Sequence, residues 1–340
     1  MIEIKQLTKT FGSLVAVNKL DLRIEAGDIF GFIGPNGAGK TTTMRILVTL
    51  MEPTFGQAFI DGLDVTKKGK EVRRRVGYMP DFMGVYDDLK VFEYLEFFAA
   101  AFGIEYAKRK SIVDGVLELT DLVSKQDALV DSLSRGMQQR LGLARVLIHD
   151  PKVLILDEPA SGLDPRARIE MRELLRELKR MGKTIMISSH ILSELEEICD
   201  RIGIIEHGQL VFSGTIEEIR PRLGLQSKVR VRVLGGEDRA RELLTALPQI
   251  QSVEVIQTAE DRGQKMDNGG PKAEDGGPKT DDGRSLSCGT TLLVTFKENM
   301  SADGLIARTL VQGGVDLVSL QPEQLKLDDA FLQLTKGIVH

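Results

Sequence analysis

A glycine-rich turn near the start of the chain is the first feature whose residues could do chemistry. The turn follows a short apolar run at residues 29–33 and ends on Lys40 and Thr41, where a helical pattern begins. Successive backbone N–H groups of such a turn can face a phosphate, and the helix N-terminus adds partial positive charge. We therefore expect Lys40 to contact the β and γ oxygens of a nucleoside triphosphate, and the Thr41 hydroxyl to ligate Mg²⁺. The predicted phosphate-binding turn consists of Gly34, Pro35, Asn36, Gly37, Ala38, Gly39, Lys40, Thr41 and Thr42.

Two adjacent acids follow a second apolar run and offer a metal ligand and a general base. Asp157 and Glu158 come directly after residues 153–156. In open α/β sheets, ligands bind at the carboxyl ends of the strands, where one carboxylate can hold a metal ion while the next orients an attacking water. This order predicts Asp157 as the metal ligand and Glu158 as the catalytic base. A charge pair without a chemical role is the alternative that the two acids alone leave open.

The elements that must position these groups are short strands that alternate with helices over the first two thirds of the chain. Several of these β-branched runs are apolar on both faces, which is typical of a mainly parallel sheet with both faces covered. His207 and Gly208, between two apolar runs, predict a hairpin that completes the sheet. The predicted fold class is therefore α/β. The predicted strands are residues 29–33, 153–156, 184–188 and 202–206.

Between Tyr78 and Ala144 the pattern becomes helical and rich in aromatic side chains. Nine of the chain's 17 phenylalanines and tyrosines lie between Tyr78 and Tyr106, which is dense enough to form a cluster. Apolar residues from Val91 to Phe102 recur with the three- and four-residue spacing of one helix face. The rings either fill a small core of this helical insertion or present a docking surface, and the sequence leaves both open.

The last third of the chain predicts a small α+β domain over residues 225–340. Residues 260–285 contain almost no apolar side chains and repeat Gly-Gly-Pro-Lys, so they cannot bury enough surface to offset the entropy of ordering. We expect a flexible loop there, between two strands. The predicted strands are 228–234, 252–256 and 291–296, and the predicted helices are 239–247 and 301–312.

Composition excludes several other classes of protein. The chain has 340 residues with 45 basic and 50 acidic side chains, and its net charge of −5 argues against bulk binding of nucleic acid. No apolar stretch reaches the roughly 18 to 20 residues of a membrane-spanning helix, and the first residues lack the apolar core of a signal peptide. Cys199 and Cys288 lie in unlike contexts, which argues against a disulfide framework or a zinc site and favours a reducing cytosol.

Residues 133–140 carry the most specific motif, which reads Leu-Ser-Arg-Gly-Met-Gln-Gln-Arg. Together with the phosphate-binding turn and the two acids, this stretch resembles the LSGGQ signature of the nucleotide-binding subunits of ATP-binding cassette (ABC) transporters. The resemblance covers about the first 220 residues. It implies a P-loop NTPase core of RecA-like fold with an antiparallel β subdomain. The implied nucleotide-binding domain spans residues 1–222, with a helical subdomain at about 82–150.

The signature motif predicts a second anion site. Ser134 and the Gly136 backbone lie at the start of a predicted helix, where partial positive charge attracts an anion. In the family that the sequence resembles, this site binds the γ-phosphate of an ATP held by the opposite subunit, so two chains must meet head to tail. A serine that only caps the helix is the alternative for Ser134.

The resemblance assigns roles to three further residues, each with a structural alternative. Phe11 resembles the aromatic residue that stacks on adenine, although a core phenylalanine would look the same in sequence. Asp164 ends the motif Ser-Gly-Leu-Asp, which resembles the D-loop that crosses the dimer; an ordinary capped turn is the alternative. His190 resembles the switch histidine that donates a hydrogen bond to the γ-phosphate, and a structural histidine is its alternative.

Three positions depart from the family's pattern. Asp81 follows Gly-Tyr-Met-Pro where the family usually places a glutamine. A carboxylate can still ligate Mg²⁺, but it repels phosphate unless the metal screens it. Arg135 and Met137 stand in the signature where glycine and glutamine are usual. Arg135 either makes a charge-assisted phosphate contact or faces solvent.

The resemblance implies the ATP-hydrolysing subunit of an ABC exporter. Two cassettes would form a homodimer that binds two ATP with Mg²⁺ and couples hydrolysis to a separate integral membrane permease at the cytoplasmic face of the membrane. The variant motifs and residues 313–337 look like the drug and antibiotic exporter branch, whose cassettes carry such a C-terminal domain. A soluble ABC ATPase not linked to transport is the alternative, and a nucleotide-regulated binding module is a third interpretation. The transported substrate stays open.

Overall fold

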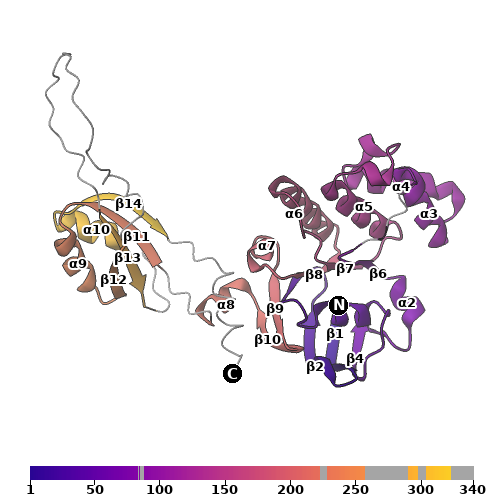
Figure 1. Ribbon diagram of the computed structural model, residues 1–340, viewed down its shortest axis with the longest axis horizontal. Coiled ribbons are helices and arrows are strands. Elements are labelled where there is room, and N and C mark those ends of the chain that lie inside the picture. Colours follow the sequence, from indigo (N-terminus) through magenta and orange to yellow (C-terminus); the bar gives the residue numbers. More distant parts are fainter. Residues whose placement is uncertain (83, 85–87, 223–227, 257–289, 298–303, 323–340) are drawn as a thin grey trace, which may run out of the picture. The chain divides into compact units, whose positions relative to one another are not determined.

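The computed structural model describes residues 1–82, 84, 88–222, 228–256, 290–297 and 304–322 (Figure 1). It divides into two compact units, one up to Ile219 and one that starts at Arg220. Each unit is described by itself. The flexible loop predicted at residues 260–285 lies outside the described residues.

A six-stranded sheet forms the centre of the first unit, in the order β10-β9-β3-β8-β7-β6. Neighbouring strands are parallel except in the hairpin of β9 and β10, where His207 and Gly208 have φ values of 46° and 77°. Left-handed φ at both positions is what a two-residue hairpin turn of this kind requires. The predicted hairpin and the α/β class are therefore confirmed. The bounds are β3 Ile29–Ile33, β6 Val76–Met79, β7 Val153–Asp157, β8 Thr184–Ser189, β9 Arg201–Glu206 and β10 Gln209–Gly214.

The parallel strands bring the candidate chemistry to one edge of the sheet. Strands β3, β7 and β8 are buried along their whole length and pair side by side, so their carboxyl ends meet. The helix α1 (Lys40–Leu47) begins beyond the end of β3, after the glycine-rich turn. Asp157 is the last residue of β7, and His190 directly follows β8. This is the edge at which open α/β sheets bind ligands.

A second, antiparallel sheet in the same unit has the order β2-β1-β4-β5. Its inner face packs with α1 and the central sheet into one core, which includes Leu20, Met44 and Ile60. Register shifts interrupt the pairing of β1 and β2, and Gln6 and Lys19 have left-handed φ values of 48°. These irregularities break the two-residue alternation, so the residue pattern did not predict the strands, whereas the family resemblance implied this subdomain. The bounds are β1 Ile2–Phe11, β2 Leu14–Ile24, β4 Phe55–Ile60 and β5 Leu63–Asp64.

The aromatic insertion consists of helices, as its spacing predicts. Tyr94 is fully buried, as the small core expected for the insertion requires, whereas Phe97 and Phe102 remain exposed. Its helices are α3 Val91–Ala101, α4 Tyr106–Leu119 and α5 Arg135–Leu147, with single 3₁₀ turns at Val123–Lys125 and Val130–Ser132. The other helices of the first unit are α2 Gly69–Arg73, α6 Pro165–Arg180 and α7 Leu192–Glu196, and α8 Ile216–Arg222 spans the boundary between the units.

The second unit has the element order βαββαβ and an antiparallel sheet in the order β12-β13-β11-β14. This is the topology of the ferredoxin-like split βαβ fold. The predicted strands at 228–234, 252–256 and 291–296 are confirmed, and β14 was missed because its alternation is weak. The core of this unit includes Val231, Leu244, Val294 and Ile306. The bounds are β11 Lys228–Leu234, α9 Glu237–Thr245, β12 Ile250–Ile256, β13 Thr290–Phe296, α10 Leu305–Gln312 and β14 Asp316–Pro322.

Candidate nucleotide-binding site

The glycine-rich turn fits tightly between its neighbours, and Gly34 and Gly39 are required for that fit. A Cβ on Gly34 would lie 2.3 Å from the Ile205 carbonyl oxygen, and one on Gly39 would lie 2.4 Å from the Ala16 carbonyl oxygen. Gly37 and Gly39 also have left-handed φ values of 83° and 106°. Only glycine combines this conformation with so close an approach of backbone to backbone. The sequence therefore specifies a turn whose backbone is held from two sides.

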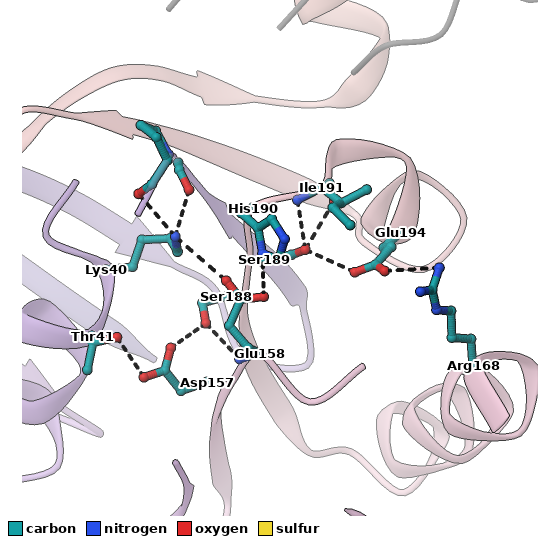
Figure 2. A network of polar contacts seen from close by, with 12 residues as sticks. Lys40, Thr41, Asp157, Glu158, Arg168, Ser188, Ser189, His190, Ile191 and Glu194 are labelled. Atoms are coloured by element: carbon teal, nitrogen blue, oxygen red, sulfur yellow. Dashed lines mark hydrogen bonds and ion pairs between the residues drawn. The ribbon is translucent and has the colours of Figure 1, made fainter. Parts of the chain in front are cut away.

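Lys40 folds back over the turn and is almost fully buried, with 6% of its surface exposed. Its Nζ donates to the carbonyl oxygens of Gly34 at 2.6 Å and Pro35 at 3.3 Å, and lies 3.7 Å from Oε1 of Glu158 (Figure 2). Burial lowers the pKa of Lys40, while the negative charges of Glu158 and Asp157 act in the opposite direction. The ammonium group thus lies between the phosphate-binding turn and the predicted base.

Asp157, at the end of β7, is joined by hydrogen bonds to the first turn of α1 and to the end of β8. Thr41 Oγ1 donates to Asp157 Oδ2 at 2.8 Å, and Ser188 Oγ donates to Asp157 Oδ1 at 2.6 Å. The carboxylate is 1% exposed, so both of its oxygens have a fixed orientation. The predicted metal ligands Thr41 and Asp157 are therefore adjacent. The Ser188 contact was not predicted, although its place two residues before His190 was a signal that could have found it.

This donor set fits Mg²⁺. A hydroxyl and one carboxylate are hard oxygen ligands, and Mg²⁺ is usually held by one or two carboxylates with waters and substrate phosphates. Among the described residues no cluster of three or more histidine, cysteine, aspartate or glutamate side chains could hold a metal ion. The remaining ligands at Thr41 and Asp157 would thus come from a nucleotide and water.

Glu158 and His190 face each other at the same edge of the sheet. His190 Nδ1 lies 3.0 Å from Glu158 Oε2, and Figure 2 shows both side chains beside Lys40. The Glu158 backbone N–H donates to Ser188 Oγ at 2.9 Å, and the residue has a left-handed φ of 52°. A left-handed conformation is costly for a residue with a side chain and persists only where the surroundings enforce it. This conformation directs the Glu158 carboxylate toward Lys40 and His190.

A second polar chain leads from this edge to α6. Ser189 Oγ donates to Glu194 Oε2 at 3.1 Å and accepts from the Ile191 N–H at 3.0 Å. Glu194 Oε1 in turn lies 3.4 Å from Arg168 Nη1 on α6, as Figure 2 shows. The segment that carries His190 is therefore fixed to the helix that follows Asp164.

The signature turn is separate from this cluster within the unit. Ser134 is exposed and caps α5, its Oγ accepting from the Met137 N–H at 3.4 Å. No hydrogen bond or ion pair between described residues joins Ser134 or Gly136 to Lys40, Asp157 or Glu158. Ser134 is therefore a helix cap within this unit, and its hydroxyl remains at the surface.

Arg135 and Asp164 belong to neighbouring surface turns. The Arg135 guanidinium lies directly over Gly162, where a Cβ would approach its Cζ to 2.3 Å. The side chain is exposed and no ion pair among the described residues neutralises it. Asp164 caps α6, accepting from the Ala167 N–H at 2.8 Å, with Pro165 at the first helical position. The capped turn proposed for Asp164 is thus present.

Two other predicted residues lie at the surface. Phe11 is 46% exposed on β1, with Lys9 Nζ 5.1 Å from its ring centroid, so the core alternative for Phe11 is wrong. Asp81 is exposed, and no hydrogen bond to another described residue holds its side chain. Burial raises the pKa of Tyr78 and the charge of Asp157 adds to this effect, while Arg45 acts in the opposite direction.

Known proteins resemble this chain in sequence and in fold. A family model described as ABC transporter matches residues 17–161. The chain is 35% identical over 338 residues to the bacitracin transport ATP-binding protein BcrA of Bacillus licheniformis, across 99% of this chain and 98% of that protein. It is 43% identical over 213 residues to the Nod factor export ATP-binding protein I of Burkholderia lata, across 63% of this chain and 70% of that protein. A dimeric bacterial ABC transporter cassette of known structure is 25% identical, with a TM-score of 0.58 over 64% of this chain and 99% of that cassette.

The parallel sheet and the glycine-rich turn at the end of β3 define a P-loop nucleotide-binding ATPase. Since a relative matches at 35% identity over nearly its whole length, the chain belongs to the ABC transporter family, as an ATP-binding subunit. In the part of the chain that the structure describes, no helix is long and apolar enough to cross a membrane.

Proposed function

We propose that two copies of this chain close head to tail on two ATP molecules. The observation that carries this proposal is the separation of the two halves of the site. Lys40, Asp157, Glu158 and His190 form one contact network, whereas the exposed Ser134 makes no contact with it. A signature turn that lies on the surface, apart from the network of its own chain, would complete the network of another chain. The bacterial cassette of known structure is itself a dimer, which supports this arrangement.

In the proposed reaction, each group of the network has one role. The turn from Gly34 to Thr42 and the N-terminus of α1 would hold the phosphates, with Lys40 turning from its carbonyl partners toward the β and γ oxygens. Glu158 would orient the attacking water, and His190 would donate a hydrogen bond to the γ-phosphate. Thr41 and Asp157, with Asp81 as a further ligand, would hold Mg²⁺, which when bound screens the charge of the phosphates.

The nucleotide site would be completed by contacts from four further residues, Phe11, Ser134, Gly136 and Asp164. We propose that Phe11 stacks on the adenine, because its ring is exposed at the last position of β1. Ser134 and Gly136 would bind the γ-phosphate across the dimer, where the N-terminus of α5 adds partial positive charge. Asp164 would approach the partner from the first turn of α6.

The proposed physiological role is export through a separate integral membrane permease at the cytoplasmic face of the membrane. The names of the two relatives, a bacitracin transport protein and a Nod factor export protein, support this role. The permease would contact the cassette beside the exposed rings of the aromatic insertion. Residues 1–222 would form the cassette, and residues 225–340 an accessory domain. A soluble ABC ATPase is the alternative, and co-purification with a membrane protein separates the two.

The substitution Glu158→Gln tests the proposed reaction. It keeps the size of the side chain but removes the base, so we expect hydrolysis to fall roughly 10²-fold or more while ATP binding persists. The variant should accumulate as an ATP-dependent dimer, measurable by size-exclusion chromatography with light scattering. Glu173→Gln, on the exposed surface of α6, is the matched control. Equal turnover in Glu158→Gln and parent would remove Glu158 from this role.

A further inference from the structure

The polar chain that leads from Ser189 to α6 continues to the turn that follows β7. Glu194 Oε2 accepts from Ser189 Oγ at 3.1 Å, and Glu194 Oε1 lies 3.4 Å from Nη1 of Arg168 (Figure 2). Arg168 Nε also donates to the Leu163 carbonyl oxygen at 3.0 Å. The chain therefore connects the two segments that also carry the predicted base and His190.

The Leu163 end of this connection is part of the turn that carries Glu158. The Ser161 N–H donates to the Glu158 carbonyl oxygen at 3.0 Å, and the Leu163 N–H donates to the Ala160 carbonyl oxygen at 3.3 Å. These two overlapping hydrogen bonds close residues 158–163 into one compact turn. A shift of the Leu163 carbonyl group would therefore move the backbone from which the Glu158 side chain extends.

The Ser189 end of the connection lies directly beside His190. Ser189 is 3% exposed, and its Oγ accepts from the Ile191 N–H at 3.0 Å, so this hydrogen bond spans His190. The Ser189 carbonyl oxygen accepts from the Gly34 N–H at 3.4 Å. The position of His190 thus depends on Ser189, whose hydroxyl is held by Glu194.

A neighbouring ion pair provides a comparison. Arg172 Nη1 on α6 pairs with Oε2 of Glu197, which also follows β8. The Glu197 side chain is 58% exposed, whereas that of Glu194 is 12% exposed. Water screens an exposed pair, so such a pair fixes geometry only weakly. Of these two ion pairs, the one made by Glu194 is shielded and reaches a neighbour of His190.

We propose that Arg168 and Glu194 are positioning residues that set the distance between the catalytic base and His190. His190 Nδ1 and Glu158 Oε2 lie 3.0 Å apart on two segments, and the connection holds those segments together a second time. A displacement of about 1 Å can cost about 10²-fold in rate, so a second link affects catalysis. Arginine suits this role because its planar guanidinium directs Nε to one acceptor and Nη1 to another, whereas lysine has a single ammonium group. The inference rests on the proposed function for the roles of Glu158 and His190.

Steady-state ATP hydrolysis by the full chain tests this role. Glu194→Ala should lower kcat roughly tenfold with little change in the KM for ATP, because the phosphate-binding turn keeps its own contacts. Arg168→Lys keeps the charge but loses the two-point contact, so we expect a similar fall in kcat. The double variant should lose no more than the more impaired single variant, since both changes break one connection. Glu197→Ala is the matched control and should leave kcat unchanged.

The ring signals of isotope-labelled histidine in NMR spectra give a readout that does not depend on turnover. The chain has four histidines, and the signal that is missing from His190→Ala identifies His190. Glu194→Ala and Arg168→Lys should each shift the His190 signal and leave the other histidine signals in place, whereas a general loss of folding would move them all. A His190 signal that stays in place in both variants would contradict the proposal.

The kinetic outcomes separate this inference from the proposed function. An unchanged kcat in Glu194→Ala, an equal fall in Glu197→Ala, or losses that add in the double variant would overturn the proposal. His190→Ala is measured in the same assay. A fall in kcat in His190→Ala with none in Glu194→Ala would contradict the inference alone, whereas an unchanged kcat in His190→Ala would contradict the role proposed for His190.

Discussion

The two halves of the candidate ATP site are built in opposite ways. On the phosphate-turn half, Lys40, Asp157 and Glu158 are nearly enclosed and are linked by hydrogen bonds and an ion pair to one another or through Ser188. On the signature half, Ser134 is exposed and its side chain makes one 3.4 Å hydrogen bond, within its own helix. One half is preorganised, and the other is a helix end on the surface.

This difference indicates which step, ATP binding or hydrolysis, depends on one chain and which depends on two. Apart from the turn of Lys40 toward the phosphates, a preorganised half can bind a nucleotide with little reordering, since Asp157 and Glu158 are already oriented. The signature half has no network to orient, so it acts only through its position against a partner. We therefore expect the phosphate-turn half to set ATP affinity, and both halves together to set the rate of hydrolysis.

Lys40→Ala should break the preorganised half most severely. The change removes the buried ammonium group that lies between the turn and Glu158, and the expected loss of ATP affinity is on the order of 10²-fold or more. Titration with a fluorescent ATP analogue measures the loss. Lys5→Ala, an exposed lysine on β1, is the control, and thermal unfolding checks that both variants fold. Retained micromolar affinity in Lys40→Ala would contradict the role of the turn.

Ser188→Ala should have a smaller effect and separates orientation from binding. The Ser188 hydroxyl accepts from the Glu158 N–H and donates to Asp157, so its loss leaves both acids less well oriented. Losses of such supporting contacts typically cost 10- to 100-fold in activity, and we expect kcat to fall about tenfold with little change in ATP affinity. Steady-state kinetics against a Ser132→Ala control measures this. A fall in affinity with an unchanged kcat would show that Ser188 supports binding instead.

The sequence predicted the phosphate-turn half well because its chemical groups come from residues that are close together along the chain. Lys40 and Thr41 follow a strand and begin a helix, and Asp157 and Glu158 end another strand, so short motifs fix their positions. Ser188 escaped prediction because its role depends on β7 and β8 lying side by side, which no single motif encodes. The contact of Arg135 with Gly162 likewise joins two turns that are distant along the chain.

The strands, like the site residues, were predicted where a local sequence pattern defines them and were missed where none does. The buried parallel strands and the His207 hairpin were predicted from continuous apolar runs and a two-residue turn. Strands β1 and β2 lack regular alternation because bulges shift their register, and β14 alternates too weakly to be recognised.

The most direct test of the account is whether a charge on the signature turn prevents two ATP-loaded chains from meeting. Ser134→Asp keeps a good helix cap but places a carboxylate where the account expects the partner's γ-phosphate, and Ser134→Asn keeps the cap without the charge. Both are made in the Glu158→Gln background and examined by sedimentation velocity with saturating ATP. We predict that Ser134→Asp binds ATP normally but sediments as a monomer, while Ser134→Asn still dimerises. An ATP-dependent dimer of Ser134→Asp as stable as that of Glu158→Gln alone would contradict the composite site.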